Sequence, residues 1–290
     1  MACSAGELGF RSELIFHRFA GRVDDLRAEH GCVRVLTPGN PSFFWGNFLL
    51  FEQAPTSDDV LRWPALFERL ITAVQPASAH RAFGWLDDAP GQIEPFLRAG
   101  YEAVDSAVMS ANSLLPAPPP RAAALLRRFE GDDDWRRLID LHVDTREADH
   151  PESVYRAFAT ARAAQWRAMQ AAGLGAWFGA FVAEGGRESL ASALGIFVET
   201  PSGLADTRDR IARYQVVVTA EAHRRAGLAR ALIVEAARYA REHLGAARFV
   251  IIAAADEMPE RLYSSLGFER MGLWRGLQKV GYASLTSGSA

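Results

Sequence analysis

Residues 214–232 read YQVVVTAEAHRRAGLARAL and contain the strongest structural signal in the chain. A run of three valines is typical of a strand, and Gly227 followed by Leu228 and Leu232 at helical spacing is typical of a helix. A strand that enters a helix through a glycine turn aims several unpaired backbone N–H groups at one point, where the helix dipole adds positive charge. Because phosphate groups bind well at such a turn, the stretch predicts a phosphate-binding strand, turn and helix.

The side chains at this turn are consistent with an anion site. Gly227 lets the backbone approach an anion without a Cβ clash, and Ala229 keeps the neighbouring wall small. Arg224, Arg225 and Arg230 can add charge-assisted hydrogen bonds. The same arginines would also suit a solvated helix start, so the turn alone does not decide between an anion site and a plain connection.

The segments around the turn predict the fold class. Residues 176–184, 190–199 and 210–219 have strand patterns separated by turn-forming sequences, which predicts antiparallel hairpins. Helical patterns lie before and after them, and residues 248–255 form a further apolar strand pattern. The expected class is α/β (α+β), in which a mixed, mostly antiparallel sheet is flanked by helices.

A gapless self-comparison indicates an internal repeat. Residues 79–104 align with residues 246–271, and each copy reads as strand, loop, short helix, glycine and strand. Clustered prolines in residues 116–122 break both helix and strand and predict a linker. We therefore expect two units of the same kind, at residues 1–115 and 123–285.

Composition narrows the possible functions. The 290 residues hold 32 basic and 35 acidic side chains, a net charge of −3, so no global basic excess favours nucleic acid as a partner. Cys3 and Cys32 cannot build a disulfide framework or a four-cysteine zinc site, and no metal-ligand spacing occurs. The sequence shows no signal-peptide core and no 18-residue apolar span, so we expect a cytoplasmic protein without membrane contact.

Together with LYSSLGFERMG at residues 262–272, the turn resembles the acetyl-CoA signature of the GCN5-related N-acetyltransferase (GNAT) family. Arg224, Gly227 and Ala229 match its pattern of Arg or Gln, two residues, Gly, one residue, and Gly or Ala. The resemblance covers residues 121–282 and implies direct transfer of an acetyl group from acetyl-CoA to a primary amine in a ternary complex. The first unit lacks the signature, so the chain resembles a tandem member with a degenerate N-terminal half.

The resemblance also implies roles for individual residues. The turn would bind the pyrophosphate of acetyl-CoA, and the strand before it would pair with the pantetheine amides. A backbone N–H near Val218 would stabilise the oxyanion, and Tyr263 would protonate the departing CoA thiolate. Tyr263 could instead simply pack against the sheet with its hydroxyl at the surface. The implied cofactor-binding residues are Val216, Val217, Val218, Arg224, Arg225, Ala226, Gly227, Leu228, Ala229 and Arg230.

The acceptor side is less well defined. An amine must be neutral to attack, and the sequence does not identify the base that deprotonates it. The acceptor-site candidates are Glu199, His142 and His150, with Glu147, Asp149 and Glu152 as further possibilities. Asp256 stands where family members often carry asparagine, and Pro259 where they often carry alanine. A carboxylate near the cofactor would repel its phosphates unless it turns outward or pairs with an arginine.

Other interpretations stay open. Trp177 or Phe178 could admit or block a longer acyl donor, and the protein could be a non-catalytic CoA-binding regulator or scaffold with the same fold. A nucleic-acid-binding module has the least support. In the first unit, acidic residues at the corresponding turn predict poor anion binding; they are Glu52, Asp58 and Asp59. We expect a small-molecule or peptide amine as acceptor, and a monomer or a homodimer.

Overall fold

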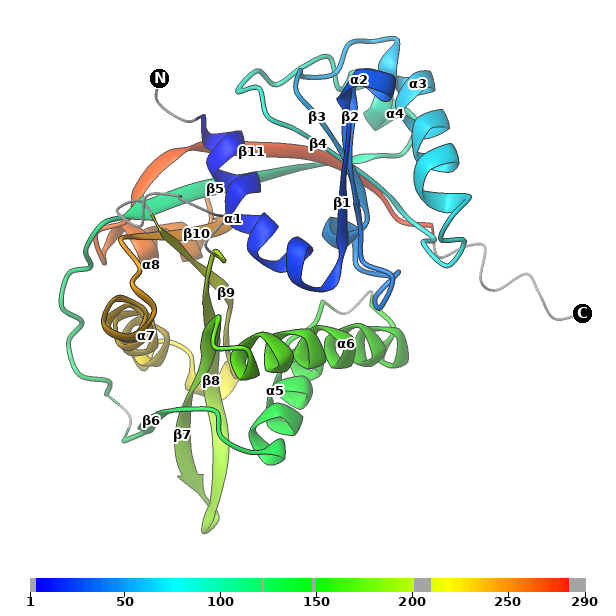
Figure 1. The fold of residues 1–290 in the computed structure, drawn as a ribbon. Helices are drawn as coiled ribbons and strands as arrows, with labels where there is room; N and C mark the ends of the chain where they lie inside the picture. The colour runs from blue at the N-terminus through cyan, green and yellow to red at the C-terminus, as the bar shows by residue number, and fades with distance from the viewer. Residues whose placement is uncertain (1–3, 122, 148–149, 201–209, 282–290) are drawn as a thin grey trace, which may run out of the picture. The chain divides into compact units, whose positions relative to one another are not determined.

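The computed structural model divides into two compact units, which we call unit 1 and unit 2 (Figure 1). The structure describes residues 4–121, 123–147, 150–200 and 210–281. Unit 1 consists of Met1–Val108, Ile252–Glu260 and Arg270–Ala290, and unit 2 consists of Met109–Ile251 and Arg261–Glu269. The expected fold class is confirmed, because each unit has a mixed sheet with helices packed against it.

Unit 1 is built on a sheet with the strand order β1-β2-β3-β4-β11-β5. Its strands are β1 (Arg22–Leu26), β2 (Cys32–Leu36), β3 (Phe48–Phe51), β4 (Arg81–Trp85), β5 (Glu102–Ala111) and β11 (Glu269–Lys279), although the end of β5 from Met109 on and the first residue of β11 belong to unit 2. Its helices are α1 (Ala5–Ala20), α2 (Arg27–His30), η1 (Phe44–Gly46), α3 (Asp59–Phe67), η2 (Glu68–Thr72) and α4 (Glu94–Arg98). Ser4 starts α1 with a capping box, because its hydroxyl accepts from Glu7 N and the Glu7 carboxylate accepts from Ser4 N.

The C-terminal strand β11 belongs to the sheet of unit 1. It pairs antiparallel with β4, from Arg275 opposite Trp85 to Lys279 opposite Arg81. The compact units therefore do not coincide with the two halves of the chain, and the division into residues 1–115 and 123–285 stays a prediction about the sequence repeat. The physical reason for the difference is this pairing, which takes the end of the chain into the first sheet.

The core of unit 1 is aromatic. Phe51 and Trp63 stack with ring centroids 3.9 Å apart, and Phe83 and Leu277 are fully buried beside them. Gly276 on β11 lies opposite Gly84 on β4, and the Trp45 ring packs over this pair. A Cβ added to Gly276 would come within 2.2 Å of the Trp45 ring. Close packing of this kind depends on β11, since Leu277 and Gly276 both lie on that strand.

Unit 2 is built on a sheet with the strand order β10-β9-β8-β7-β6. Its strands are β6 (Leu125–Arg128), β7 (Gly175–Glu184), β8 (Arg187–Val198), β9 (Ile211–Thr219) and β10 (Arg248–Ala254). Its helices are α5 (Asp132–Asp144), α6 (Glu152–Ala171), η4 (Glu221–His223), α7 (Leu228–Leu244) and α8 (Met258–Ser264), although α8 and β10 each run partly into unit 1. Within unit 2, α7 covers one face of the sheet and α5 and α6 cover the other (Figure 1).

The two units repeat one topology. In unit 1, α3 connects the parallel strands β3 and β4, and in unit 2, α7 connects the parallel strands β9 and β10. The first residues of β4 and β10, Arg81 and Arg248, are 167 residues apart, and so are the first residues of β5 and β11, Glu102 and Glu269. The internal repeat is thus confirmed in the secondary structure.

Candidate active site

The candidate site in unit 2 begins at a bulge in β9. Ala193 on β8 lies opposite Val218, and Gly195 lies opposite Gln215. One residue of β8, Leu194, therefore lies opposite two residues of β9, Val216 and Val217. Val216 has a φ of 42°, which is unfavourable for a β-branched residue. Strained backbone of this kind clusters at functional sites, and a bulge frees peptide groups from the ladder.

The bulge is held firmly on its C-terminal side. The Ser192 hydroxyl donates to the Val218 carbonyl oxygen at 2.8 Å and lies 2.8 Å from the Thr219 hydroxyl. Val216 is 39% exposed, whereas Val218 is buried. The structure thus brings the predicted residues 216–218 together as one bulged segment that leads towards α7.

The residues after β9 form a turn at the start of α7, and we call residues 224–230 the glycine turn. Arg225 has a φ of 63°, and Gly227, with a φ of 84°, is the N-cap of α7. Ala231 N donates to Gly227 O, which is the first helical hydrogen bond, so the N–H groups of residues 228–230 have no partner within the helix. No side chain caps these groups, and the first turn of α7 carries no acidic residue.

The glycine turn is strongly positive. Arg224 and Arg225 are exposed, and Arg230 donates to the Ser265 hydroxyl at 2.9 Å. Free N–H groups, a helix dipole and three arginines all favour an anion at this point. The residues present therefore fit the phosphates of a CoA ester.

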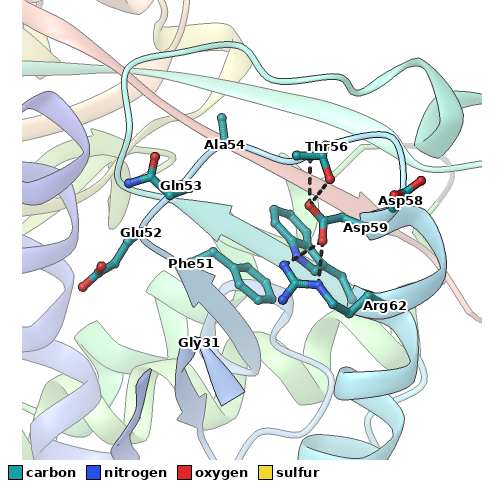
Figure 2. Close-up of a pocket in the computed structure, with 10 residues that line it drawn as sticks. Gly31, Phe51, Glu52, Gln53, Ala54, Thr56, Asp58, Asp59 and Arg62 are labelled. Atoms are coloured by element: carbon teal, nitrogen blue, oxygen red, sulfur yellow. Dashed lines mark hydrogen bonds and ion pairs between the residues drawn. The ribbon is translucent and has the colours of Figure 1, made fainter. Parts of the chain in front are cut away.

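Unit 1 has a pocket of about 390 Å³ at the corresponding turn between β3 and α3, but its chemistry is different (Figure 2). The Asp59 carboxylate accepts hydrogen bonds from Thr56 N at 2.8 Å and from Arg62 Nε at 2.7 Å. Burial alone would raise the pKa of Asp59, but the hydrogen bonds from Thr56 and Arg62 outweigh it and hold the pKa below its usual value. A buried carboxylate thus lies where unit 2 has arginines, with Glu52 and Asp58 also lining the pocket.

Tyr263 lies on α8 close to the buried part of β9. Its side chain is buried, and its ring centroid lies 6.1 Å from that of Phe268. Burial raises the pKa of Tyr263 to about 12, and the nearby charge of Arg213 offsets part of the increase. Tyr263 therefore keeps its proton at neutral pH and can donate it in a hydrogen bond.

Arg213 was missed by the sequence analysis. It is buried in β9 and donates to the Tyr214 carbonyl oxygen. A buried cation three residues before the bulge lowers the energy of a negative charge formed on Tyr263. The signal for it was a single charged residue in the apolar run IARYQVVV, residues 211–218.

The acceptor-site candidates do not gather at the bulge. The Glu199 carboxylate accepts a hydrogen bond from Ile211 N at 3.1 Å. Ile211 is the first residue of β9, and a strand rise of about 3.3 Å per residue places it about 16 Å from Val216. His150 lies in the connection before α6, where its carbonyl oxygen accepts from Arg146 Nε at 3.1 Å. Asp149 lies outside the described residues.

His142 is part of the core of unit 2. Its ring is buried on α5, with ring centroids 5.8 Å from Trp166 and 6.3 Å from Trp177. Burial, with a further contribution from the charge of Arg162, lowers the pKa of His142 to about 4. Trp177 and Phe178 are buried on β7 in unit 2, two strands away from the bulge.

Acidification below pH 6.5 is expected to destabilise the protein. Burial lowers the pKa of His80 to about 4, against the opposing effect of its hydrogen bond to Asn47 O, so both His80 and His142 stay neutral in the folded state. Between pH 6.5 and about 4 the unfolded chain therefore binds protons that the folded protein does not, and the free energy of unfolding falls as the pH is lowered. Each histidine can contribute up to about 3 kcal/mol, measurable by urea unfolding at pH 7, 5.5 and 4.5.

The control for this effect is the double variant His80→Gln, His142→Gln. It is expected to be less stable at pH 7 but to lose less stability on acidification, because the two buried imidazoles no longer titrate. Carboxylates with lowered pKa values, such as Asp59 and Asp134, lose their contribution at lower pH, below about 4. An unchanged pH dependence in the double variant would rule out the histidines as its cause.

Asp256 does not act as a free negative charge. It is exposed, and its carboxylate accepts from Arg270 Nη1 at 2.9 Å. Its backbone has a φ of 62°, and its N–H donates to the Glu260 carboxylate. A carboxylate near the cofactor would repel its phosphates unless it turned outward or paired with an arginine, and Asp256 is paired with Arg270.

A family model matches the part of the chain that contains this candidate site. Residues 193–275 match the family model described as FR47-like protein, and this segment contains the bulge, the glycine turn and Tyr263. No curated protein sequence matches the chain. No helix among the described residues has the length and apolar character needed to cross a membrane.

Solved structures match over nearly the whole chain. A conserved protein of unknown function from Staphylococcus epidermidis is 11% identical with a TM-score of 0.63, over 91% of this chain and 95% of that chain. A GCN5-related N-acetyltransferase from Kribbella flavida is 14% identical with a TM-score of 0.58, over 97% of each chain. A tandem GNAT protein from the clavulanic acid biosynthesis pathway is 16% identical with a TM-score of 0.48, over 96% and 89%. The fold expected from the GNAT resemblance is confirmed.

Proposed function

We propose that the protein is an acyl-CoA-dependent N-acyltransferase that moves an acetyl group from acetyl-CoA to a primary amine, with the chemistry in unit 2. The observation that carries this proposal is the bulged end of β9 leading directly into the acid-free, arginine-rich glycine turn. Such a turn suits the pyrophosphate, and the strand before it can pair with an extended amide chain. The match to the FR47-like family model over this segment supports the same donor.

The bulge supplies the groups for the reacting carbonyl. An amine nitrogen attacks the thioester carbon, the carbonyl oxygen takes up negative charge, and the C–S bond then breaks with its electron pair on sulfur. Backbone N–H groups of the segment Val216–Val218, freed from the ladder by the bulge, would stabilise that oxygen. Because Ser192 fixes the Val218 carbonyl, this backbone is preorganised for the task.

Tyr263 would donate its proton to the departing thiolate. The pKa of Tyr263, about 12, lies well above that of a thiol, about 8.5, so complete transfer of the proton to sulfur is energetically unfavourable. The hydroxyl would therefore act mainly as a hydrogen-bond donor to sulfur. Arg213 would stabilise any phenolate that forms. The proton released by the amine must leave through another group or through water.

The acceptor amine must lose a proton before it can attack, so a base or a water chain has to serve it. His142, with a pKa of about 4, is too weak a base to deprotonate an ammonium group efficiently. The Glu199 carboxylate is already used by the backbone of Ile211. His150, in the connection before α6, is therefore the acceptor-site residue that we would substitute first. We propose a small-molecule or peptide amine as acceptor.

Tyr263→Phe is expected to lower kcat about 10²-fold with little change in KM for acetyl-CoA. The reason is that the ring and its packing against Phe268 stay, while the donor to the leaving group is lost. The measurement is thiol release from acetyl-CoA with a panel of primary amines, followed for the unaltered protein and the variant.

This experiment also tests the main alternative, a CoA-binding regulator or scaffold. Acetyl-CoA bound with micromolar affinity, but no thiol release with any amine, would favour that alternative over an enzyme. Turnover that Tyr263→Phe leaves unchanged would keep the enzyme but remove Tyr263 from its mechanism.

A further inference from the structure

We propose that the proline-rich linker forms one wall of the donor site, and that Arg121 on it binds the 3′-phosphate of acetyl-CoA. The inference rests on the proposed function, because it assigns a residue to the donor site of unit 2. We call residues 112–121 the linker strap. It belongs entirely to unit 2, so its position is described within one compact unit.

The linker strap is attached to unit 2 at both ends. Arg241 on α7 donates to the Asn112 carbonyl oxygen, and Leu115 N donates to Leu266 O at 2.9 Å. At the other end, Arg121 N donates to Ala226 O at 2.9 Å. The last of these bonds places the backbone of Arg121 directly beside the glycine turn.

The prolines make this wall stiff and bring it close to the turn. The Cα atom of Pro120 lies 3.5 Å from the position of a Cβ added to Gly227, which is van der Waals distance. Proline fixes φ and has no N–H, so residues 118–120 cannot fold into a helix and lose little entropy when they are held in place. The strap can therefore present Arg121 at a fixed place beside the turn.

The charge of Arg121 is not compensated. Its side chain is exposed and has no acidic partner among the residues that the structure describes, and the same holds for Arg224 and Arg225. Some other exposed arginines of unit 2 have an acidic partner, for example Arg136 with Asp133 and Arg167 with Asp132, whereas the described surroundings of Arg187 and Arg261 provide none. Arg121 differs from Arg187 and Arg261 in lying beside Arg224 and Arg225 at the glycine turn. Repulsion among the cations at the turn is relieved by a ligand that carries several negative charges.

The positions of the glycine turn and Arg121 indicate which phosphate group of acetyl-CoA each would bind. The N–H groups of residues 228–230 lie inside the glycine turn and suit the pyrophosphate. Arg121 lies on the strap, at the rim of the turn, and its exposed guanidinium can reach a second phosphate outside it. Acetyl-CoA carries such a group on its ribose, the 3′-phosphate.

The test is calorimetric titration of the full-length protein with acetyl-CoA and with acetyl-dephospho-CoA, which lacks only the 3′-phosphate. The variants are Arg121→Gln and, as the matched control, Arg136→Gln, which removes an exposed arginine from α5 on the opposite face of the sheet (Figure 1). Arg121→Gln keeps the backbone hydrogen bond to Ala226 and replaces an exposed side chain, so the variant is expected to fold. The Tm of each variant checks this.

The expected result is that Arg121→Gln raises Kd for acetyl-CoA about tenfold and leaves Kd for acetyl-dephospho-CoA within about twofold. Arg136→Gln should change neither value. An equal effect on both donors, or no effect on either, would overturn the assignment of Arg121 while leaving the proposed function intact. If the unaltered protein bound neither donor, the proposed function would fail and the inference with it.

Discussion

A chain that ends after Glu269 is expected to lose the folded state of unit 1. The missing strand β11 pairs with β4 over five residues and contributes the fully buried Leu277 to the core. Its loss exposes the edge of β4 and opens a cavity beside Phe83. Leu277→Ala alone should cost about 2–5 kcal/mol, which is a large part of the stability of a small domain.

Hydrogen exchange of the full chain and the shortened chain measures this effect. Amides of β3 and β4 are expected to exchange freely after the truncation, because their protection depends on a closed sheet. A chain that ends after Gly281 is the control, since it keeps all of β11. Protection of β4 that survives removal of residues 270–290 would show that unit 1 does not need the strand.

Local patterns in the second half of the sequence were sufficient to predict the strands β7, β8, β9 and β10, but not which sheet each strand joins, and no prediction was made for α1, β1 or β2. The repeat predicts two copies of one strand-helix-strand unit, and β4 and β10 begin at equivalent positions. A strand pattern records burial of alternate side chains, and it does not specify the neighbouring strand. Because β5 and β11 are equivalent strands of the two copies, the sequence could not show that β11 pairs with β4.

The site was partly predictable for a similar reason. Gly227 and the arginines around it are local signals, and the structure places them at one turn. The bulge at Val216 has no sequence signal, because valine disfavours a positive φ and is held there only by the surrounding sheet. Arg121 could not be connected to the turn either, since more than 100 residues separate it from Ala226 and only the folded chain brings them together.

Gly227→Glu is expected to abolish measurable binding of acetyl-CoA. The residue has a φ of 84°, so any side chain there strains the start of α7, and a carboxylate places negative charge among the N–H groups that would receive the pyrophosphate. The added bulk also meets Pro120, whose Cα is 3.5 Å from the Cβ position. We expect a rise in Kd of at least about 10³-fold, which corresponds to about 4 kcal/mol.

The matched control for this variant is Gly173→Glu. Gly173 also has a positive φ, 72°, and ends a helix of unit 2, but an added Cβ there has no atom within 4 Å. It therefore carries the same strain and the same charge without touching the glycine turn, and its Kd should stay within about twofold of the unaltered protein. Gly227→Ala, which adds bulk without charge, should fall between the two. If Gly227→Glu bound acetyl-CoA as tightly as Gly173→Glu does, the donor phosphates could not lie at the glycine turn, and the donor site would have to be sought elsewhere in the chain.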